Sequence, residues 1–178
     1  MTPDVADSGT VALLDGTIVP YRPIRPGDRE ALQRFHGRLS GASIYFRFFG
    51  ARPYLSDAMS RHFTELDGRD RFALVALDPV APDEIIAVVR FDREPGTASA
   101  EYAAIVVDAW QGRGLGFQLT KRLIAAAIDR GIRSFYALVL PENLRMLNLL
   151  RDLRLPERIR FEEGVERIDV ELGEPAPA

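Results

Sequence analysis

Apolar and polar positions alternate or recur at helical spacing along most of the chain, which predicts short strands mixed with helices. Near the start, apolar runs over residues 11–14 and 17–24 flank Asp15-Gly16, a pair typical of a tight hairpin turn. Pro20 and Pro23 each lack a backbone donor. The second run is therefore predicted to be an edge strand at best.

Three short helical segments are expected after this hairpin. Asp28 is a candidate N-cap for a helix over residues 29–39, and Ser56 is a candidate cap for another that continues to residue 66. Between them, residues 43–49 place four aromatic rings within five positions, as a short helix or turn at the border of a pocket. Stacking on nucleotides is conceivable there, but the charge of the chain favours a hydrophobic wall.

The middle of the chain predicts the centre of a sheet. Three apolar runs joined by short turns indicate an antiparallel meander over residues 72–77, 85–91 and 98–107. An amphipathic pattern over residues 115–130 predicts a helix that Gly131 ends. The apolar run that follows should return as a parallel strand by a right-handed connection.

The complete pattern predicts one α/β (α+β) domain over residues 11–172. Its sheet is expected to be mixed and mostly antiparallel, with six to seven strands and about four flanking helices. A second helix over residues 143–153 and a hairpin across Glu163-Gly164 complete the elements. Residues 1–10 are expected to be disordered, and residues 173–178 to be a flexible end.

A glycine-rich loop between a strand and a helix is the strongest chemical signal. Residues 111–116 contain three glycines and lead directly into the amphipathic helix. The first N–H groups of a helix have no internal partner, so such a loop can hold a phosphate, although a turn without a ligand remains an alternative. The spacing is not that of a Walker A loop, and Phe117 stands where the dinucleotide fingerprint needs its third glycine.

Composition excludes several other classes. The chain has 178 residues, with 23 Lys and Arg against 26 Asp and Glu, and this net charge of -3 argues against a nucleic-acid partner. Without cysteine, and with only His36 and His62 as imidazoles, no metal site is expected. The acidic start does not resemble a signal peptide, and no segment could span a membrane. A cytoplasmic protein is the expectation.

The spacing Gln-x-x-Gly-x-Gly at residues 111–116 resembles the pyrophosphate loop of the GCN5-related N-acetyltransferases, the GNAT family. Other segments resemble the acetyltransferase domain of bacterial Pat-type protein lysine acetyltransferases; they are residues 14–17, 22–28, 39–40, 45–49, 100–101, Asp108 and 140–146. The resemblance extends over residues 11–172. It implies the GNAT fold and acetyl-CoA as cofactor.

The resemblance also implies site residues. Glu101 matches the general base, which a lysine amine needs because its pKa is about 10.4 and it must lose a proton before attacking a thioester. Backbone groups of Val106 and Val107 would pair with the pantetheine arm, and a mid-strand N–H near Val106 could stabilise the developing oxyanion. Asn143 would face the cofactor. The pyrophosphate would be held by the amides of Gln111, Gly112, Arg113, Gly114, Leu115 and Gly116.

The chain departs from the family pattern in three places. Leu150 stands where many members have the tyrosine that protonates the leaving thiolate, so the thiolate leaves unassisted or another group supplies the proton. Arg154-Leu155 replaces the usual glycine pair at the end of the second helix, which removes an easy left-handed cap. Several Pat-type enzymes also carry a fused regulatory or synthetase-like domain, whereas this chain is expected to be a lone catalytic domain.

The leading hypothesis is therefore direct transfer of an acetyl group from acetyl-CoA to an amine, most of all a protein lysine. An acyl-CoA synthetase-like enzyme is one expected acceptor, and a homodimer stays open as the assembly. Two alternatives remain. The acceptor could be a small amine or amino acid, or the domain could be a non-catalytic CoA-sensing module.

Overall fold

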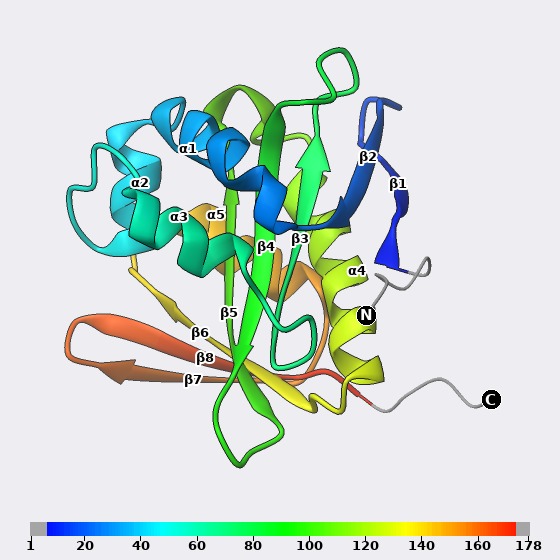
Figure 1. Cartoon of the computed structure of the whole chain (residues 1–178). Coiled ribbons are helices and arrows are strands. Elements are labelled where there is room, and N and C mark those ends of the chain that lie inside the picture. The colour runs from blue at the N-terminus through cyan, green and yellow to red at the C-terminus, as the bar shows by residue number, and fades with distance from the viewer. Residues whose placement is uncertain (1–6, 174–178) are drawn as a thin grey trace.

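A single twisted sheet organises the computed structural model, which describes residues 7–173 (Figure 1). The sheet has eight strands in the order β1-β2-β3-β4-β5-β6-β8-β7. The strands are β1 (Gly9–Ala12), β2 (Ile18–Pro23), β3 (Arg71–Leu77), β4 (Ile85–Arg93), β5 (Ser99–Val106), β6 (Ser134–Val139), β7 (Glu157–Glu162) and β8 (Val165–Glu171). This confirms the mixed, mostly antiparallel α+β class.

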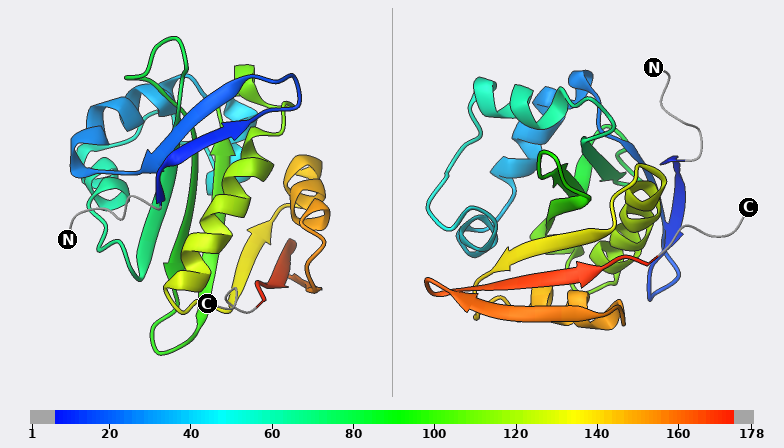
Figure 2. Two further views of the ribbon diagram at one scale, coloured as in Figure 1. Left: turned by 90° about the vertical axis from the view of Figure 1, so that its right-hand side faces the viewer. Right: turned by 90° about the horizontal axis from the view of Figure 1, so that it is seen from below.

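Helices cover both faces of this sheet. The helices are α1 (Arg29–Gly37), α2 (Gly41–Phe48), α3 (Asp57–Thr64), α4 (Leu115–Asp129) and α5 (Leu144–Asp152), with 3₁₀ turns η2 (Pro26–Asp28) and η3 (Asp108–Trp110). Helices α1–α3 lie over one face, and α4 and α5 lie over the other (Figures 1 and 2). Within residues 7–173 there are more strands than the expected six to seven, because β2 is a full member of the sheet. There are also more helices than the expected four or so, because residues 41–48 form a true helix.

The edge position predicted for β2 is wrong. This strand pairs with β1 on one side and with β3 on the other. The β1 ladder ends at Tyr21 and the β3 ladder begins there, so Pro20 lies in only the first and Pro23 in only the second. At each proline the strand is therefore paired on one side only. A residue without a backbone N–H is tolerated there, because no neighbouring strand needs that donor on the other side.

The ends of the domain differ from the sequence expectation. Strand β1 begins at Gly9, inside the segment 1–10 that was expected to be disordered. Residues 1–6 of that segment lie outside the described residues, as do residues 174–178 of the expected flexible end.

One of the two predicted N-caps is confirmed. The Ser56 side chain accepts the N–H of Met59 and begins α3, as predicted. Asp28 precedes α1 but does not cap it, because its carboxylate accepts the Arg25 N–H and forms an ion pair with Arg22 at 2.7 Å. The side chain of Asp28 therefore fixes the approach to the helix and not its first turn.

Helix α5 ends with a left-handed residue although no glycine is available there. Arg154 has φ 55°, and its N–H donates to the carbonyl of Arg151. The missing glycine therefore does not remove the left-handed cap, and the strain of a non-glycine residue is accepted instead.

The region where β5 leaves β6 positions the site. These two strands are parallel, as predicted, but their register covers only Ser99↔Ser134, Ala100↔Phe135 and Glu101↔Tyr136. On the other side of β5 the antiparallel ladder with β4 continues to Val106. Beyond Glu101 the two strands therefore diverge, and backbone groups of β5 face a gap in the sheet.

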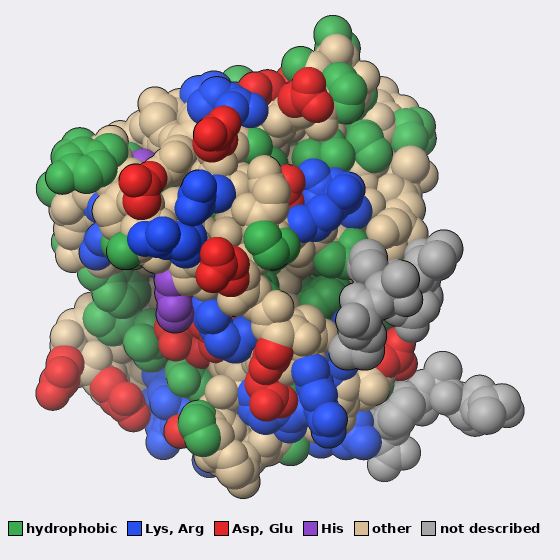
Figure 3. All heavy atoms as spheres, viewed as in Figure 1, with side chains coloured by type: hydrophobic (Ala, Val, Ile, Leu, Met, Phe, Trp, Pro, Cys, Tyr) green, Lys and Arg blue, Asp and Glu red, His purple; other side chains and the backbone are tan. Residues whose placement is uncertain are grey.

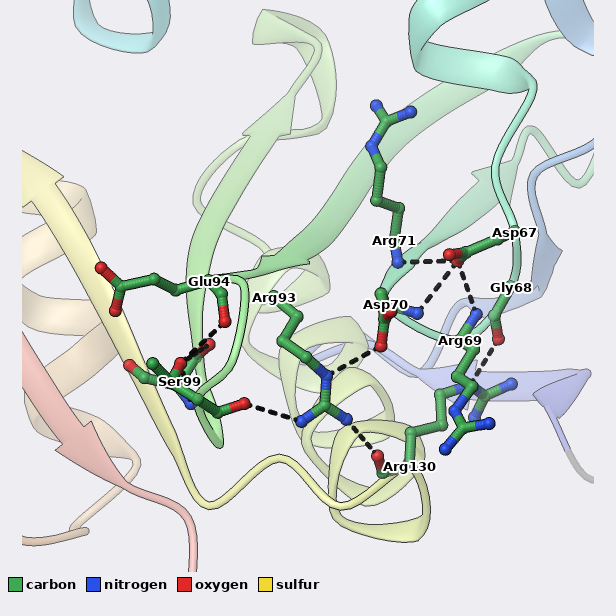
Figure 4. A network of polar contacts seen from close by, with 10 residues as sticks. Asp67, Gly68, Arg69, Asp70, Arg71, Arg93, Glu94, Ser99 and Arg130 are labelled. Atoms are coloured by element: carbon green, nitrogen blue, oxygen red, sulfur yellow. Dashed lines mark hydrogen bonds and ion pairs between the residues drawn. The ribbon is translucent and has the colours of Figure 1, made fainter.

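An arginine at the opposite end of β4 ties the scaffold together. Arg93 forms an ion pair with Asp70 at 2.8 Å and donates to the carbonyls of Thr97 and Arg130 (Figure 4). Arg130 in turn donates to the carbonyl of Gly68 at 2.7 Å. These contacts join the turn before β3, the β4–β5 turn and the end of α4, so every side of the Arg93 guanidinium has an acceptor.

Candidate functional site

A cavity of about 480 Å³ opens where β5 and β6 diverge. Its walls come from α2, the second half of β5, the end of β6 and the beginning of α5. Its size is within the range of ligand sites, which are typically about 300–1,000 Å³. The cavity contains Glu101, Val106, Gln111, Gly116 and Asn143 among its lining residues, so it brings together much of the predicted site.

Gln111 joins three elements around this cavity. Its side-chain amide donates to the carbonyl of Val106 at 2.8 Å and to the hydroxyl of Ser43 on α2 at 3.1 Å. Its side-chain oxygen accepts from Arg145 on α5. The backbone N–H of Gln111, however, donates to the Asp108 carbonyl at 3.2 Å. This amide therefore has a partner within the protein, and its contact with a pyrophosphate stays a prediction, while the Gln111 side chain joins β5, α2 and α5.

The glycine loop presents a run of backbone donors. Helix α4 begins at Leu115, and its first internal bond is from Gln118 to the carbonyl of Gly114. Within the described part of the chain, the N–H groups of residues 112–117 have no hydrogen-bond acceptor. Gly112 and Gly114 have φ of 75° and 86°, a backbone conformation that favours glycine and turns these donors toward one side. Such a nest suits a diphosphate, and Phe117 belongs to it although the motif does not include that position.

Glycines also allow close packing around the loop. A Cβ at Gly116 would lie 3.2 Å from Leu149 and 3.4 Å from Val106, and a Cβ at Gly114 would lie 3.2 Å from the Leu14 side chain. The third glycine of the motif therefore lets α4 approach both β5 and α5.

The side chain of Arg113 faces away from the cavity. Its guanidinium forms an ion pair with Asp15 at 2.8 Å, donates to the Thr17 hydroxyl and lies 4.3 Å from the centre of the Trp110 ring. Arg113 therefore attaches the β1–β2 hairpin to the glycine loop, and its backbone N–H is the part available to a ligand. Trp110 is a packing partner in this contact.

The two valines at the end of β5 are not equivalent. Val107 donates its N–H to Ile86 at 3.0 Å, and its carbonyl accepts from Trp110 at 2.8 Å. Both backbone groups of Val107 therefore have partners within the protein, and its pairing with the pantetheine arm stays a prediction. Neighbouring strand residues point to opposite sides, so Val106 and Ala104 direct their backbone groups toward the gap. Ala104 was missed because this parity depends on the strand register.

Glu101 lies at the last pair of the short β5–β6 ladder, opposite Tyr136. It is exposed, and within residues 7–173 its carboxylate has no hydrogen-bond or ion-pair partner. Burial, followed by the negative charge of Glu101, raises the pKa of Tyr136. An accessible carboxylate beside a cavity can receive a proton from an amine.

Asn143 precedes α5 as its N-cap and Leu150 lies within the helix, and their surroundings differ. The side-chain oxygen of Asn143 accepts the Met146 N–H at 3.2 Å and caps the helix, while the residue lines the cavity. Its side-chain NH₂ is the group left for a ligand. Leu150 is only 2% exposed and packs in the core, so no proton donor occupies this position.

A second set of polar residues fixes α2 against the end of β5. Asp108 accepts the N–H of Ser40 at 2.9 Å and the hydroxyl of Ser43 at 3.2 Å. Burial alone would raise the pKa of Asp108, but these hydrogen bonds lower it below its usual value. The aromatic segment thus forms a wall of the cavity, as the sequence predicted.

Surface charge, metal-binding side chains and helix length bear on the other functional classes. Lys and Arg side chains are interspersed with Asp and Glu on the face in Figure 3, without an extended basic surface. No group of three or more metal-binding side chains occurs in residues 7–173. In the same range no helix is both long and apolar enough to cross a bilayer.

Comparison with known proteins places this cavity in context. The model of the family described as "Acetyltransferase (GNAT) family" matches residues 41–153. An acetyltransferase of Pseudomonas aeruginosa is 33% identical over 146 residues, which are 80% of this chain and 77% of that protein. Acetyltransferase Pat of Mycolicibacterium smegmatis is 35% identical over 130 residues, which are 72% of this chain but 38% of that protein.

Solved structures give the same picture. The GNAT domain of S. lividans PAT has a TM-score of 0.87 and 36% identity, and the match covers 94% of this chain and 98% of that one. A cAMP-binding acyltransferase from Mycobacterium smegmatis has a TM-score of 0.65 and 30% identity, and the match covers 93% of this chain but 47% of the other.

Proposed function

Because this chain belongs to the acetyltransferase (GNAT) family, and is an acetyl-CoA-dependent acetyltransferase, we propose that it acetylates the ε-amine of lysine in a protein. The observation that carries the proposal is the position of Glu101, whose exposed carboxylate lies beside the open end of the cavity. A lysine is long enough to bring its amine there from another protein. The similarity to Pat supports this acceptor class.

The chain's own residues suit the cofactor. Acetyl-CoA supplies the acetyl group as a thioester. The free N–H groups of residues 112–117 would hold its pyrophosphate, and the backbone of Ala104 and Val106 would pair with its extended arm. The side-chain NH₂ of Asn143 would donate to the same arm.

Glu101 has one task in this proposal. It would take a proton from the incoming ammonium, so that the neutral amine could attack the thioester carbon. The C–S bond would then break, and CoA would leave as a thiolate. The N–H of Val106 faces the gap between β5 and β6 and would stabilise the oxyanion. Tyr102 of β5 is buried, its hydroxyl is bonded to Thr120 on α4 at 2.6 Å, and burial raises its pKa, so this phenol is not a free acid.

A panel of acceptors tests the proposal. The purified chain is incubated with acetyl-CoA and, separately, with an acyl-CoA synthetase, lysine peptides, free amino acids and polyamines. Because the chain has no cysteine, released CoA can be measured with a thiol reagent without background from the enzyme. Acetylation of lysine in the protein or peptides, located by mass spectrometry, is the expected result. Turnover with free amines alone would show that the acceptor is a small amine and not a protein lysine. No turnover with any amine would favour a CoA-sensing module.

A matched pair of variants tests the glycine loop. Gly112 has φ 75° with nothing within 4 Å of a Cβ, and Asp and Asn tolerate this conformation better than most residues. Gly112→Asp places a carboxylate beside the free donors, whereas Gly112→Asn has the same shape without charge. We expect Asp to weaken acetyl-CoA binding by roughly tenfold or more relative to Asn, as measured by calorimetry. Equal acetyl-CoA affinities of the Asp and Asn variants would show that the glycine loop does not bind the pyrophosphate.

A further inference from the structure

Three arginines lie close together beneath α2 and α3, and within residues 7–173 none of them forms an ion pair. Arg47 and Arg52 lie 4.8 and 5.2 Å from the Phe48 ring, and Arg90 lies 4.4 Å from the Phe63 ring. We call Arg47, Arg52 and Arg90 the arginine cluster.

Two donor atoms of the arginine cluster are buried and unsatisfied. They are Nη1 of Arg90 and Nε of Arg52. Arg90 is only 6% exposed, and its other terminal nitrogen donates to the carbonyl of Phe63 at 3.1 Å. Burial, and then the charge of Arg47, lower the pKa of Arg90 to about 9, so it stays charged at neutral pH. Buried charges without partners are destabilising, and such an arrangement is typical of a binding site.

The arginine cluster lies beside the proposed acceptor site. Arg90 pairs with Ala103 across the β4–β5 ladder, and Asp92 pairs with Glu101. Arg90 and Glu101 are thus diagonal neighbours on one face of the sheet, with backbones about 7 Å apart. Asp92 contacts Arg71 at 3.3 Å, and the negative charges of Glu101 and Asp92 act on Arg47 from a distance without an ion pair among the described residues.

Arg47 connects the cluster to the large cavity. It lines that cavity together with Glu101, and it also lines a second cavity of about 30 Å³ that contains Arg90. The small cavity can hold no more than one small group, so a larger ligand must enter from the side of Glu101.

We propose that the arginine cluster binds a carboxylate carried by the acceptor, next to the amine that is acetylated. The planar guanidinium of Arg47 has the paired donors that a carboxylate accepts. The carboxylate belongs to an acidic residue beside the target lysine, or to a free amino acid. The proposal rests on the proposed function, because it needs an acceptor whose amine reaches Glu101.

Peptides that differ at one position test this selectivity. Three short peptides carry Glu, Gln or Lys beside the same lysine, and free lysine is compared with its methyl ester. For the wild type we expect kcat/KM to be about 10- to 100-fold higher for the Glu than for the Gln peptide, with the Lys peptide poorest. In Arg47→Gln the Glu and Gln peptides should become equivalent, and Arg47→Lys should restore part of the difference.

Arg61→Gln is the matched control. Arg61 is exposed on α3, so this variant loses the same charge from the same side of the molecule without touching the cluster. It should discriminate like the wild type. Equal rates for the Glu and Gln peptides, together with equal rates for free lysine and its methyl ester, would overturn the carboxylate site and leave lysine acetylation intact. A preference seen only between free lysine and its ester would assign the carboxylate to a small acceptor and overturn the protein acceptor instead.

If no peptide reacts, a binding measurement that needs no turnover tests whether the arginine cluster binds a carboxylate. Chloride is replaced stepwise by acetate at constant sodium concentration, and thermal unfolding is followed. Acetate should raise the midpoint of the wild type and of Arg61→Gln, but not that of Arg47→Gln. An unchanged midpoint in the wild type would overturn the proposal.

Discussion

Arg90 and Arg93 lie three residues apart on β4 but on opposite faces of the sheet, and their surroundings differ completely. Arg93 has an acidic partner, two carbonyl acceptors and a position that joins three segments. Arg90 has one carbonyl acceptor, a buried unsatisfied nitrogen and another arginine as its neighbour. The contacts of Arg93 stabilise the fold. The position of Arg90 is unfavourable by itself and is maintained by the rest of the fold.

The difference separates the scaffold from the site. On the face covered by α4, the polar groups at the end of β4 are satisfied within the protein. On the face covered by α1–α3, the arginine cluster and the carboxylate of Glu101, which has no hydrogen-bond or ion-pair partner within residues 7–173, lie beside a cavity. Functional sites are often regions where local interactions are left incomplete. The two faces should therefore respond oppositely to mutation.

The largest effect is expected for Glu101→Gln, which removes the proposed base and keeps the shape of the side chain. Turnover should fall by about 100- to 10,000-fold, or roughly 3–5 kcal/mol of activation free energy. Acetyl-CoA affinity and unfolding midpoint should not change, because Glu101 is exposed. Steady-state kinetics and calorimetry measure both, and Glu94→Gln, in the exposed β4–β5 turn, is the control. Unchanged turnover would exclude Glu101 as the base.

On the scaffold face, Arg93→Met should reduce the free energy of unfolding by about 2–4 kcal/mol. The ion pair with Asp70 is lost, and the carbonyls of Thr97 and Arg130 lose their donor. Urea denaturation measures the loss. Activity per folded molecule should stay at the wild-type level at low temperature. If Arg93→Met were as stable as the wild type, the contrast between the two arginines would disappear.

On the site face, Arg90→Met should leave the free energy of unfolding within about 1 kcal/mol of the wild type or increase it. Met replaces an uncompensated charge with an apolar group of similar length, and the repulsion from Arg47 is removed. The same urea experiment compares it directly with Arg93→Met. A loss above about 2 kcal/mol would instead assign Arg90 a structural role.

The smallest effect concerns Asp15, at the rim of the glycine loop. Hydrogen bonds from Thr17 and Arg113 lower its pKa from 3.8 to about 2. A lowered pKa in the folded state stabilises the protein above the unfolded pKa near 4, and this contribution is lost as the pH falls toward 2. Trp110 is the single tryptophan and lies under Arg113, so its fluorescence should change over this range. In Asp15→Asn this component of the change should be absent.

The sequence predicted the elements of the fold well because its hydrophobic pattern and turn residues act locally. It failed at β2, where the effect of Pro20 and Pro23 depends on where two neighbouring ladders end. The same kind of information separates Val106 from Val107. Both fit the motif, but only the register tells which N–H faces the gap.

The arginine cluster was missed for a different reason. Whether an arginine is satisfied depends on residues distant in sequence, and Arg47 and Arg90 are 43 positions apart. One local signal was available, since Arg90 is a charged residue inside the apolar run of residues 85–91. A charge at a position that the pattern predicts to be buried indicates either a partner or a ligand.

The divergence of β5 and β6 also has a mechanical meaning. Only the three residue pairs of the β5–β6 ladder connect strands β1–β5 to strands β6, β8 and β7 within the described sheet. This short ladder therefore divides the sheet into a larger and a smaller unit. Leu138 and Val139 line the cavity from the smaller unit, and Ala104 and Val106 line it from the larger one. A ligand that forms hydrogen bonds with the free edge of β5 and also packs against β6 connects the two units of the sheet. Binding should therefore stiffen the whole molecule and slow amide hydrogen exchange in β6, β7 and β8, far beyond the residues it touches.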